Sequence, residues 1–197
     1  MSQAFFISDT DAPAKQMIMV EALRLFSRKG LRETTIRDIA TAAGYTNPAL
    51  YKHFPSKDAL ALELFIACYR EITRALDAAM SLHESFDLRL RALVRTYTAS
   101  FDAYPDAVMF AGDHLSKFWS EVPRAMKRRT IITLIRELVE LGENEGCMPP
   151  GTDIEVRVAT IEGTLGQLTR LVYLGGMNGP TSKYNDDIEN TLHRALT

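Results

Sequence analysis

Apolar residues recur every three or four positions along almost the whole chain, and no stretch shows the strict apolar–polar alternation of a strand. Turn-forming Gly and Pro residues interrupt this period and separate the predicted helices. The pattern predicts an all-α fold of nine helices, with a three-helix N-terminal head and a helical C-terminal body. The expected ranges are 13–29, 35–43, 46–53, 56–81, 84–103, 105–119, 121–145, 153–174 and 182–195.

The range 35–43 has the pattern of a helix with one buried face, and its ends carry clear signals. The apolar residues of that face are Ile36, Ile39, Ala40 and Ala43. Thr35 and Asp38 have the spacing of a capping box, with Asp in place of the more usual Glu. Gly44 supplies the left-handed backbone conformation that ends a helix with little strain.

A second, shorter helix is expected at 46–53. Thr46 is a favourable N-cap, and Pro48 in the first turn removes no hydrogen bond that the helix would make. Leu50 and Phe54 are four residues apart, so both can face the core, while the polar N-terminal turn points elsewhere. Two helices joined by a tight Gly-containing turn form a helix-turn-helix, whose second helix enters the major groove of DNA.

The residues around this motif are of the types that contact DNA. Hydroxyl and free N–H groups at helix N-termini, together with Tyr, Lys and Arg, bind phosphate without reading sequence. Thr46 and Asn47 are the better candidates for base readout. For His53, a polar role near a helix C-terminus is a close alternative to phosphate contact. The predicted DNA-binding residues are Thr34, Thr35, Arg37, Thr46, Asn47, Pro48, Tyr51, Lys52, His53 and Lys57.

The segment from about residue 15 to residue 65 resembles the DNA-binding domain of TetR-type (tetracycline-repressor-like) transcriptional regulators. The matching residues are Ala22, Leu25, Phe26, Gly30, Thr34, Thr35, Ile39, Ala40, Ala43, Gly44, Leu50, Tyr51, His53, Phe54, Lys57 and Leu60. The resemblance implies that the short helix reads the major groove and that Tyr51, Lys52 and His53 touch phosphate. Asn47-Pro48 departs from the small residue or Gly of many members, which leaves the operator sequence open.

The charge of the chain is unevenly distributed. The formal net charge is -2, but residues 13–58 hold eight Lys/Arg and four Asp/Glu, whereas residues 59–197 hold fifteen and nineteen. A basic head on an acidic body fits a DNA-binding protein. The alternative, a bundle in which the helix-turn-helix only packs, does not account for the agreement of caps, turn and basic residues. The expected organisation is a loose tail at 1–12, a DNA-binding domain at 13–58 and a ligand-binding and dimerisation domain at 59–197.

Aromatic, Met and His residues concentrate in the middle helices. Phe110, His114 and Phe118 share one helical face, and apolar walls with a few polar groups are typical of a small-molecule site. The resemblance likewise implies an inducer cavity in the body. Filling of a core explains any single one of these residues equally well. The predicted ligand-binding residues are Tyr97, Phe101, Met109, Phe110, His114 and Phe118.

The helix expected at 153–174, with a capping box at Thr152 and Glu155, carries a heptad seam, and the last helix has apolar residues at matching intervals. Two such helices from each of two copies can form a four-helix bundle. The resemblance implies dimerisation through the same two helices. In the alternative interpretation the seam packs only against its own body. The predicted dimer interface consists of Ile154, Val158, Ile161, Leu165, Leu168, Val172, Ile188 and Leu192.

Other classes of protein find less support. Two Cys do not make a disulfide framework, and no apolar run reaches the ~18 residues of a membrane helix, so a cytoplasmic protein is expected. Asp113, His114 and Ser116 lie together, but one helix cannot arrange them as a catalytic triad. No HxxxH, CxxC or Gly-rich phosphate loop is present, so neither a metal nor a cofactor is predicted.

The sequence thus predicts a homodimeric transcriptional repressor that is released from a palindromic operator by a small, largely apolar or aromatic effector. The main alternative is a helical small-molecule sensor that does not regulate through DNA. The two differ in whether the head binds duplex DNA at physiological salt.

Overall fold

Helices make up the regular structure of the protein, as the period of its apolar residues predicts. The computed structural model describes residues 6–8 and 10–197, and this part holds ten α-helices, three short 3-10 helices and no strand. The prediction of an all-α fold is confirmed. The described chain divides into two compact units, one with the residues up to Glu71 and Asp106–Val122, the other with Ile72–Pro105 and Pro123–Thr197. No helix in the described ranges is long and apolar enough to cross a membrane.

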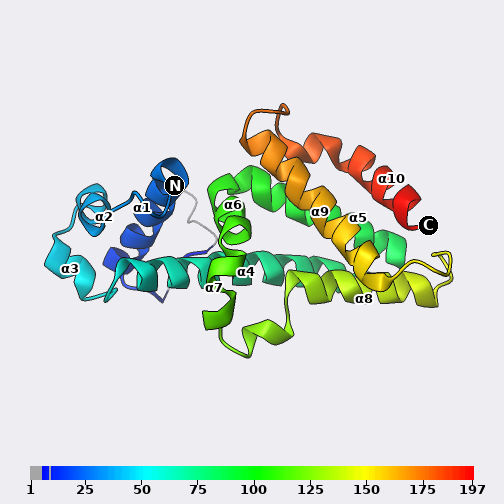
Figure 1. The fold of residues 1–197 in the computed structure, drawn as a ribbon, viewed down its shortest axis with the longest axis horizontal. Coiled ribbons are helices and arrows are strands. Elements are labelled where there is room, and N and C mark those ends of the chain that lie inside the picture. Colours follow the sequence, from blue (N-terminus) through cyan, green and yellow to red (C-terminus); the bar gives the residue numbers. More distant parts are fainter. Residues whose placement is uncertain (1–5, 9) are drawn as a thin grey trace. The chain divides into compact units, whose positions relative to one another are not determined.

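The first unit contains the N-terminal helices and a later segment of the chain (Figure 1). Its elements are α1 (Pro13–Lys29), α2 (Ile36–Ala43), α3 (Asn47–Tyr51), the first part of α4 (Lys57–Met80), most of α6 (Pro105–Asp113), α7 (Leu115–Phe118) and η1 (Trp119–Glu121). Helix α2 packs on both α1 and α3. The core of these helices includes Ile18, Ala22, Phe26, Ile39, Leu50, Phe54, Leu60 and Leu64, all of which are buried.

The second unit is a bundle around α5. Its elements are the end of α4, α5 (Phe86–Ala103), η2 (Met126–Arg128), α8 (Ile131–Asn144), α9 (Ile154–Tyr173), η3 (Thr181–Tyr184) and α10 (Asn185–Leu196). Helix α5 contacts α8, α9 and α10, and α9 lies beside α10 (Figure 1). The apolar face of α8 packs inward through Leu134, Ile135, Leu138 and Val139. This unit therefore buries the amphipathic faces of its helices against one another.

Three predicted helix boundaries in the body are wrong. The predicted helix 105–119 is interrupted at His114, whose backbone (φ -107°, ψ 6°) leaves the helical region two residues after helix-weakening Gly112. The predicted helix 121–145 begins only at Ile131, where Thr130 and Thr133 form a capping box. The N-cap of α9 is Asp153 and not Thr152, because the Asp153 carboxylate accepts the Glu155 N–H at 2.8 Å.

A buried arginine holds the loop between α8 and α9. The Arg157 guanidinium pairs with Glu143 at 2.6 Å and donates to the carbonyl groups of Thr152, at 3.1 Å, and Pro149. A planar guanidinium with five donors suits this task, because the loop carbonyl groups have no helical partner. The end of α8 and the start of α9 are thus tied through one side chain.

Asp102 at the end of α5 holds the loop that leads into α10. Its carboxylate accepts the backbone N–H groups of Thr181 at 2.6 Å and Ser182 at 2.9 Å. Burial raises the pKa of Asp102, but the hydrogen bonds from Ser182 and Thr181 outweigh it, so the pKa lies below its ordinary value.

We expect Asp102→Asn to lower the free energy of unfolding at neutral pH by about 1–2 kcal/mol, since the two N–H groups face different carboxylate oxygens and the amide replaces one of these oxygens with an NH₂ group. A carboxylate with a lowered folded-state pKa stabilises above its unfolded pKa, and this contribution is lost as the pH falls through the folded value. Urea unfolding between pH 7 and pH 3 should therefore show a gap between wild type and variant that is constant above about pH 5 and narrows in acid. A gap independent of pH would contradict the assigned role of the carboxylate.

Candidate functional site

The helix-turn-helix is built by local hydrogen bonds at the ends of its helices. The Asp38 N–H donates to the Thr35 hydroxyl at 3.1 Å, and the Thr35 N–H donates to the Asp38 carboxylate at 3.0 Å. The backbone hydrogen bond from Thr35 holds the pKa of Asp38 below its usual value. Gly44 ends α2 in the left-handed region, with φ 76°. The predicted capping box and turn are both confirmed.

Helix α3 is anchored by two side chains and exposes most of the others. Leu50 and Phe54 are buried in the core of the first unit. Thr46 caps the helix by accepting the Ala49 N–H at 3.4 Å, as its sequence position predicts. The residues of this region that are exposed are Tyr45, Thr46, Asn47, Pro48, Tyr51 and Lys52, and His53 is half-buried. Because Leu50 and Phe54 anchor one face of this short helix in the core, its N-terminal half is exposed to solvent and available for contact with another molecule.

Two of the predicted phosphate contacts are engaged within the protein. Thr34 is fully buried, and its hydroxyl donates to the carbonyl groups of Gly30 at 2.8 Å and Leu25 at 3.3 Å. The Lys57 ammonium donates to three carbonyl groups of the loop between α1 and α2. By contrast, Arg37 and Lys52 are exposed and form no ion pair with any described side chain.

Two residues that the sequence interpretation did not single out for DNA contact are exposed close to the motif. Tyr45 directly precedes the N-cap of α3, and Arg32 lies in the loop that leads into α2. Position alone could have indicated both, since a large polar or basic side chain beside a helix cap is available to phosphate.

Ser56 is the N-cap of α4, because its hydroxyl accepts the Ala59 N–H at 3.0 Å.

Four of the six predicted ligand-binding residues lie in α6, at the break after it, or in α7, within the first unit. The Phe110 ring stacks on Phe26 of α1, with 5.7 Å between centroids and 11° between planes. The His114 ring lies between those of Phe110 and Phe118, with centroid distances of 4.4 Å and 6.1 Å. The Phe118 ring in turn contacts that of Phe65 in α4, with 5.5 Å between centroids. We call these five residues the aromatic column. The remaining predicted residue in this unit, Met109, directly precedes Phe110 in α6 and is also buried.

The His114 ring is oriented by a backbone carbonyl group of α6. Its Nδ1 atom lies 3.1 Å from the Phe110 carbonyl oxygen, which can only accept, so Nδ1 carries the proton in this contact. Within a row of phenyl rings, His114 supplies a polar group of fixed direction.

The two remaining predicted ligand-binding residues lie in α5 of the second unit. Phe101 is buried. Burial raises the pKa of the Tyr97 phenol, while a hydrogen bond with Thr169 of α9 acts in the opposite direction. The predicted set is thus divided between the two units, with four residues in the first and two in the second.

The predicted dimer seam lies largely inside the second unit. Its residues Val158, Ile161, Leu165, Ile188 and Leu192 are buried, whereas Ile154, Leu168 and Val172 are half-buried. The physical reason is that α9 turns this face toward α5 and α8 of its own chain. Of these five side chains, Ile188 lines the groove described below, whereas Val158, Ile161, Leu165 and Leu192 do not form a surface that a second copy could contact.

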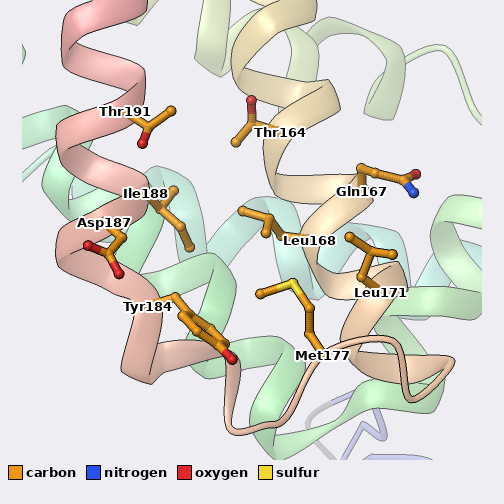
Figure 2. A pocket seen from close by; sticks show the side chains of 9 residues that line it. All are labelled: Thr164, Gln167, Leu168, Leu171, Met177, Tyr184, Asp187, Ile188 and Thr191. Carbon is orange, nitrogen blue, oxygen red and sulfur yellow. The ribbon is translucent and has the colours of Figure 1, made fainter.

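A face of α9 that includes Leu168 of the predicted seam but none of its other α9 residues remains open, and a groove of about 470 Å³ runs between this face and α10. Figure 2 shows Leu168 and Met177 in the middle of the groove, with Ile188 and Tyr184 on the side of α10. The residues lining the groove are Thr164, Gln167, Leu168, Leu171, Met177, Tyr184, Asp187, Ile188 and Thr191. Leu174, just after α9, is 72% exposed.

Residues 18–64 match the family model described as bacterial regulatory proteins, tetR family. The chain is 31% identical over 167 residues to the HTH-type transcriptional repressor KstR2 of Rhodococcus jostii, with 79% of this chain and 78% of that protein covered. The structure of the ketosteroid transcriptional regulator KstR2 of Mycobacterium tuberculosis has the same fold, with a TM-score of 0.80 and 19% identity over 97% of this chain and 98% of that one.

The transcriptional regulator FadR of Bacillus subtilis, solved in complex with stearoyl-CoA, also shares the fold. Its TM-score is 0.78 at 12% identity, and the match covers 92% of this chain and 98% of that one. The helix-turn-helix geometry, the family model and the 31% identical relative agree. The chain belongs to the tetR family of bacterial regulatory proteins and is a DNA-binding transcriptional regulator.

Proposed function

We propose that this regulator is a ligand-responsive repressor that binds a two-fold symmetric operator in the cytoplasm as a homodimer. The observation that carries the proposal is the exposure of the N-terminal half of α3 on a helix anchored by buried Leu50 and Phe54. Two such helices about 34–36 Å apart would enter successive major grooves of DNA.

The exposed residues of the head divide by chemistry into two groups. Asn47 carries an amide that can make two hydrogen bonds to an adenine edge, and the Thr46 hydroxyl can still donate while it caps α3. Tyr51 and Lys52 end in groups that donate to phosphate, as do Arg37, Thr35 and, from its half-buried position, His53. Base contacts set the operator, and phosphate contacts set affinity for any DNA.

We expect Asn47→Ala to reduce the ratio of operator to random-DNA affinity by roughly 1–3 kcal/mol for each half-site in which Asn47 contacts a base. Tyr51→Phe should instead weaken binding to operator and random duplexes by similar factors, because a lost phosphate contact carries no sequence information. Fluorescence anisotropy with both duplexes at one salt concentration measures the two ratios. If the two substitutions change the ratio equally, the division into base and phosphate contacts fails.

The effector is proposed to be a molecule with a large apolar part. Two proteins of the same fold support this proposal, since one is named a ketosteroid transcriptional regulator and another was solved in complex with stearoyl-CoA. In the first unit of this chain, α6 supplies the buried apolar side chains of Met109 and Phe110, and His114 after it adds one polar group. A mainly apolar site with few oriented polar groups suits such a ligand.

The aromatic column supports a route from effector to DNA. Phe110 in α6 stacks on Phe26, and Phe26 lies in the last turns of α1, the helix on which α2 packs. A ligand that binds one position of α6 better than another therefore biases the position of α1 in the same unit. Such differential binding is sufficient for release, without any contact between ligand and DNA.

Phe26→Leu should weaken the coupling between effector binding and the release of operator DNA. The smaller side chain removes the stack on Phe110 but leaves α6 unchanged, so effector binding to the free protein should stay within about threefold of wild type while the release of operator falls severalfold. The probe is whichever of stearoyl-CoA or a ketosteroid releases the wild-type protein, measured by anisotropy on operator and by calorimetry on free protein.

The control for Phe26→Leu is Phe86→Leu, a similar loss of core volume in α5 of the second unit, where Phe86 packs against His193. It should leave the coupling intact. Equal loss of coupling in both variants would indicate general destabilisation and would remove the proposed role of the stack.

The proposed dimer interface is the open face of α9 together with α10. Leu168, Leu171 and Met177 give this face an apolar centre, and a large uncovered apolar patch is typical of a protein interface. Gly163 and Gly166 have no neighbouring atom within 4 Å of the space where a Cβ atom would lie, so another backbone can approach α9 there. The surface of one copy would meet the same surface of its partner about a two-fold axis.

We expect Leu171→Glu to yield folded monomers in sedimentation experiments, because a charge in the centre of the interface must be desolvated on association. Leu165→Glu should unfold the protein instead, since Leu165 is buried in its own subunit. Leu82→Glu is the matched control on an 81% exposed site and should remain dimeric. A folded dimer of Leu171→Glu would place the interface elsewhere.

A further inference from the structure

Lys57, the first residue of α4, makes an unusual set of contacts for a predicted phosphate ligand. Its Nζ atom donates to the carbonyl oxygens of Thr34 at 2.8 Å, Leu31 at 2.9 Å and Arg32 at 3.1 Å. An ammonium group has three donors, so all of them are used within the protein. We propose that Lys57 is a positioning residue that holds the reading head in its DNA-binding shape and is not a phosphate ligand, a role that rests on the DNA-binding function proposed above.

The position of Lys57 in its helix fits this role. A cation at a helix N-terminus faces the positive end of the helix dipole and is poorly placed there. The side chain of Lys57 instead extends to the loop between α1 and α2, where carbonyl groups outside a helix need donors. The charge is thereby stabilised by three carbonyl dipoles, and α4 is tied to a segment 23 to 26 residues earlier in the chain.

Thr34 completes the same arrangement from the buried side. Its hydroxyl donates to the carbonyl groups of Gly30 and Leu25, the latter in the last turns of α1. Lys57 with three donors and Thr34 with one lie within hydrogen-bond distance of five carbonyl groups between residues 25 and 34, and the Thr34 hydroxyl is shared between two of these groups. The end of α1, the loop and the start of α4 are therefore joined by two side chains.

This loop leads directly into the motif that reads DNA. Thr34 precedes Thr35, the N-cap of α2, so the hydrogen bond from Lys57 to the Thr34 carbonyl fixes the backbone where α2 begins. The position of α2 in turn sets that of α3, because the two helices pack together. A head whose helices are already in place loses less conformational freedom on binding DNA, which raises affinity.

The decisive variant is Lys57→Arg, because it keeps the charge and changes the geometry. A planar guanidinium presents its donors as a fork and cannot direct three of them from one nitrogen to three converging carbonyl groups. A phosphate ligand would tolerate this exchange, whereas a positioning residue would not. Lys57→Met removes the charge as well, and Lys52→Met, on an exposed residue without an ion pair to any described side chain, serves as the control for a phosphate contact.

The experiment measures binding to a symmetric duplex selected from a random library, as a function of salt, together with amide hydrogen exchange of the free proteins. Affinities are corrected for the folded fraction, determined by circular dichroism. We expect both Lys57 variants to bind about tenfold more weakly with an unchanged slope of log K against log salt, since no phosphate contact is lost. Their amides at residues 30–36 should exchange faster than in wild type.

Lys52→Met should behave in the opposite way. The magnitude of its salt slope should fall by about 0.9 for each lost phosphate contact, or about 1.8 in a dimer, and exchange at residues 30–36 should not change. If Lys57→Arg binds like wild type and Lys57→Met shows the smaller slope, Lys57 is a phosphate ligand and the proposal is overturned. If the Lys57 variants melt earlier but bind normally when folded, the residue is only structural, and the proposal is again overturned.

Thr34 provides a second test if the Lys57 variants do not fold. Thr34→Val removes the hydroxyl at nearly constant volume and should also weaken operator binding with an unchanged salt slope, and Thr34→Ser should restore it. Normal binding by Thr34→Val would contradict the proposal. If the wild type binds no duplex of any sequence, the proposed function fails, and hydrogen exchange alone decides the role of Lys57: unchanged exchange at residues 30–36 overturns it.

Discussion

The stack of Phe110 on Phe26 is the contact that joins α6 to the helices of the DNA-binding head within the first unit. It joins α6 to α1 across 84 positions of sequence that no local signal connects, and both rings are buried. Burying a phenyl side chain contributes roughly 1.5–3 kcal/mol, and the stacked geometry adds about 0.5–1.5 kcal/mol. The segment of α6 and α7 around His114 is therefore part of the same compact unit as the helix-turn-helix.

Polar contacts fix the backbone of the first unit where the packing of the aromatic column cannot. Apolar packing is not directional, so buried rings alone leave the backbone at the start of α2 free to shift. Hydrogen bonds are directional, and the donors of Lys57 and Thr34 specify where the loop carbonyl groups lie. In the head, buried apolar side chains fix α3, and the hydrogen bonds of Lys57 and Thr34 fix the start of α2. The exposed side chains of these helices take part in neither set of contacts.

Sequence alone was sufficient wherever the controlling chemistry is local. The capping box of Thr35, the left-handed Gly44 and the N-cap Thr46 depend on neighbours within a few residues, and the structure contains all three. It was insufficient where distant segments decide the outcome. Thr34 and Lys57 are residue types that bind phosphate, and only the loop carbonyl groups beside them show that their donors are already used. The start of α8 at Ile131 was missed because a Thr–Thr capping box is a weaker sequence signal than Thr–Glu.

The heptad seam of α9 shows why a periodic pattern of apolar residues does not identify which helix covers it. A heptad pattern indicates that one face of a helix is covered by another helix, but the covering helix can belong to the same chain or to a second copy. Here the regular face, with Val158, Ile161 and Leu165, is covered by the protein's own helices. The neighbouring face, with Leu171 outside the pattern and Leu168 at its edge, borders an open groove. Since an interface must be uncovered in the single subunit, exposure and not the heptad pattern selects the side chains of the proposed dimer interface.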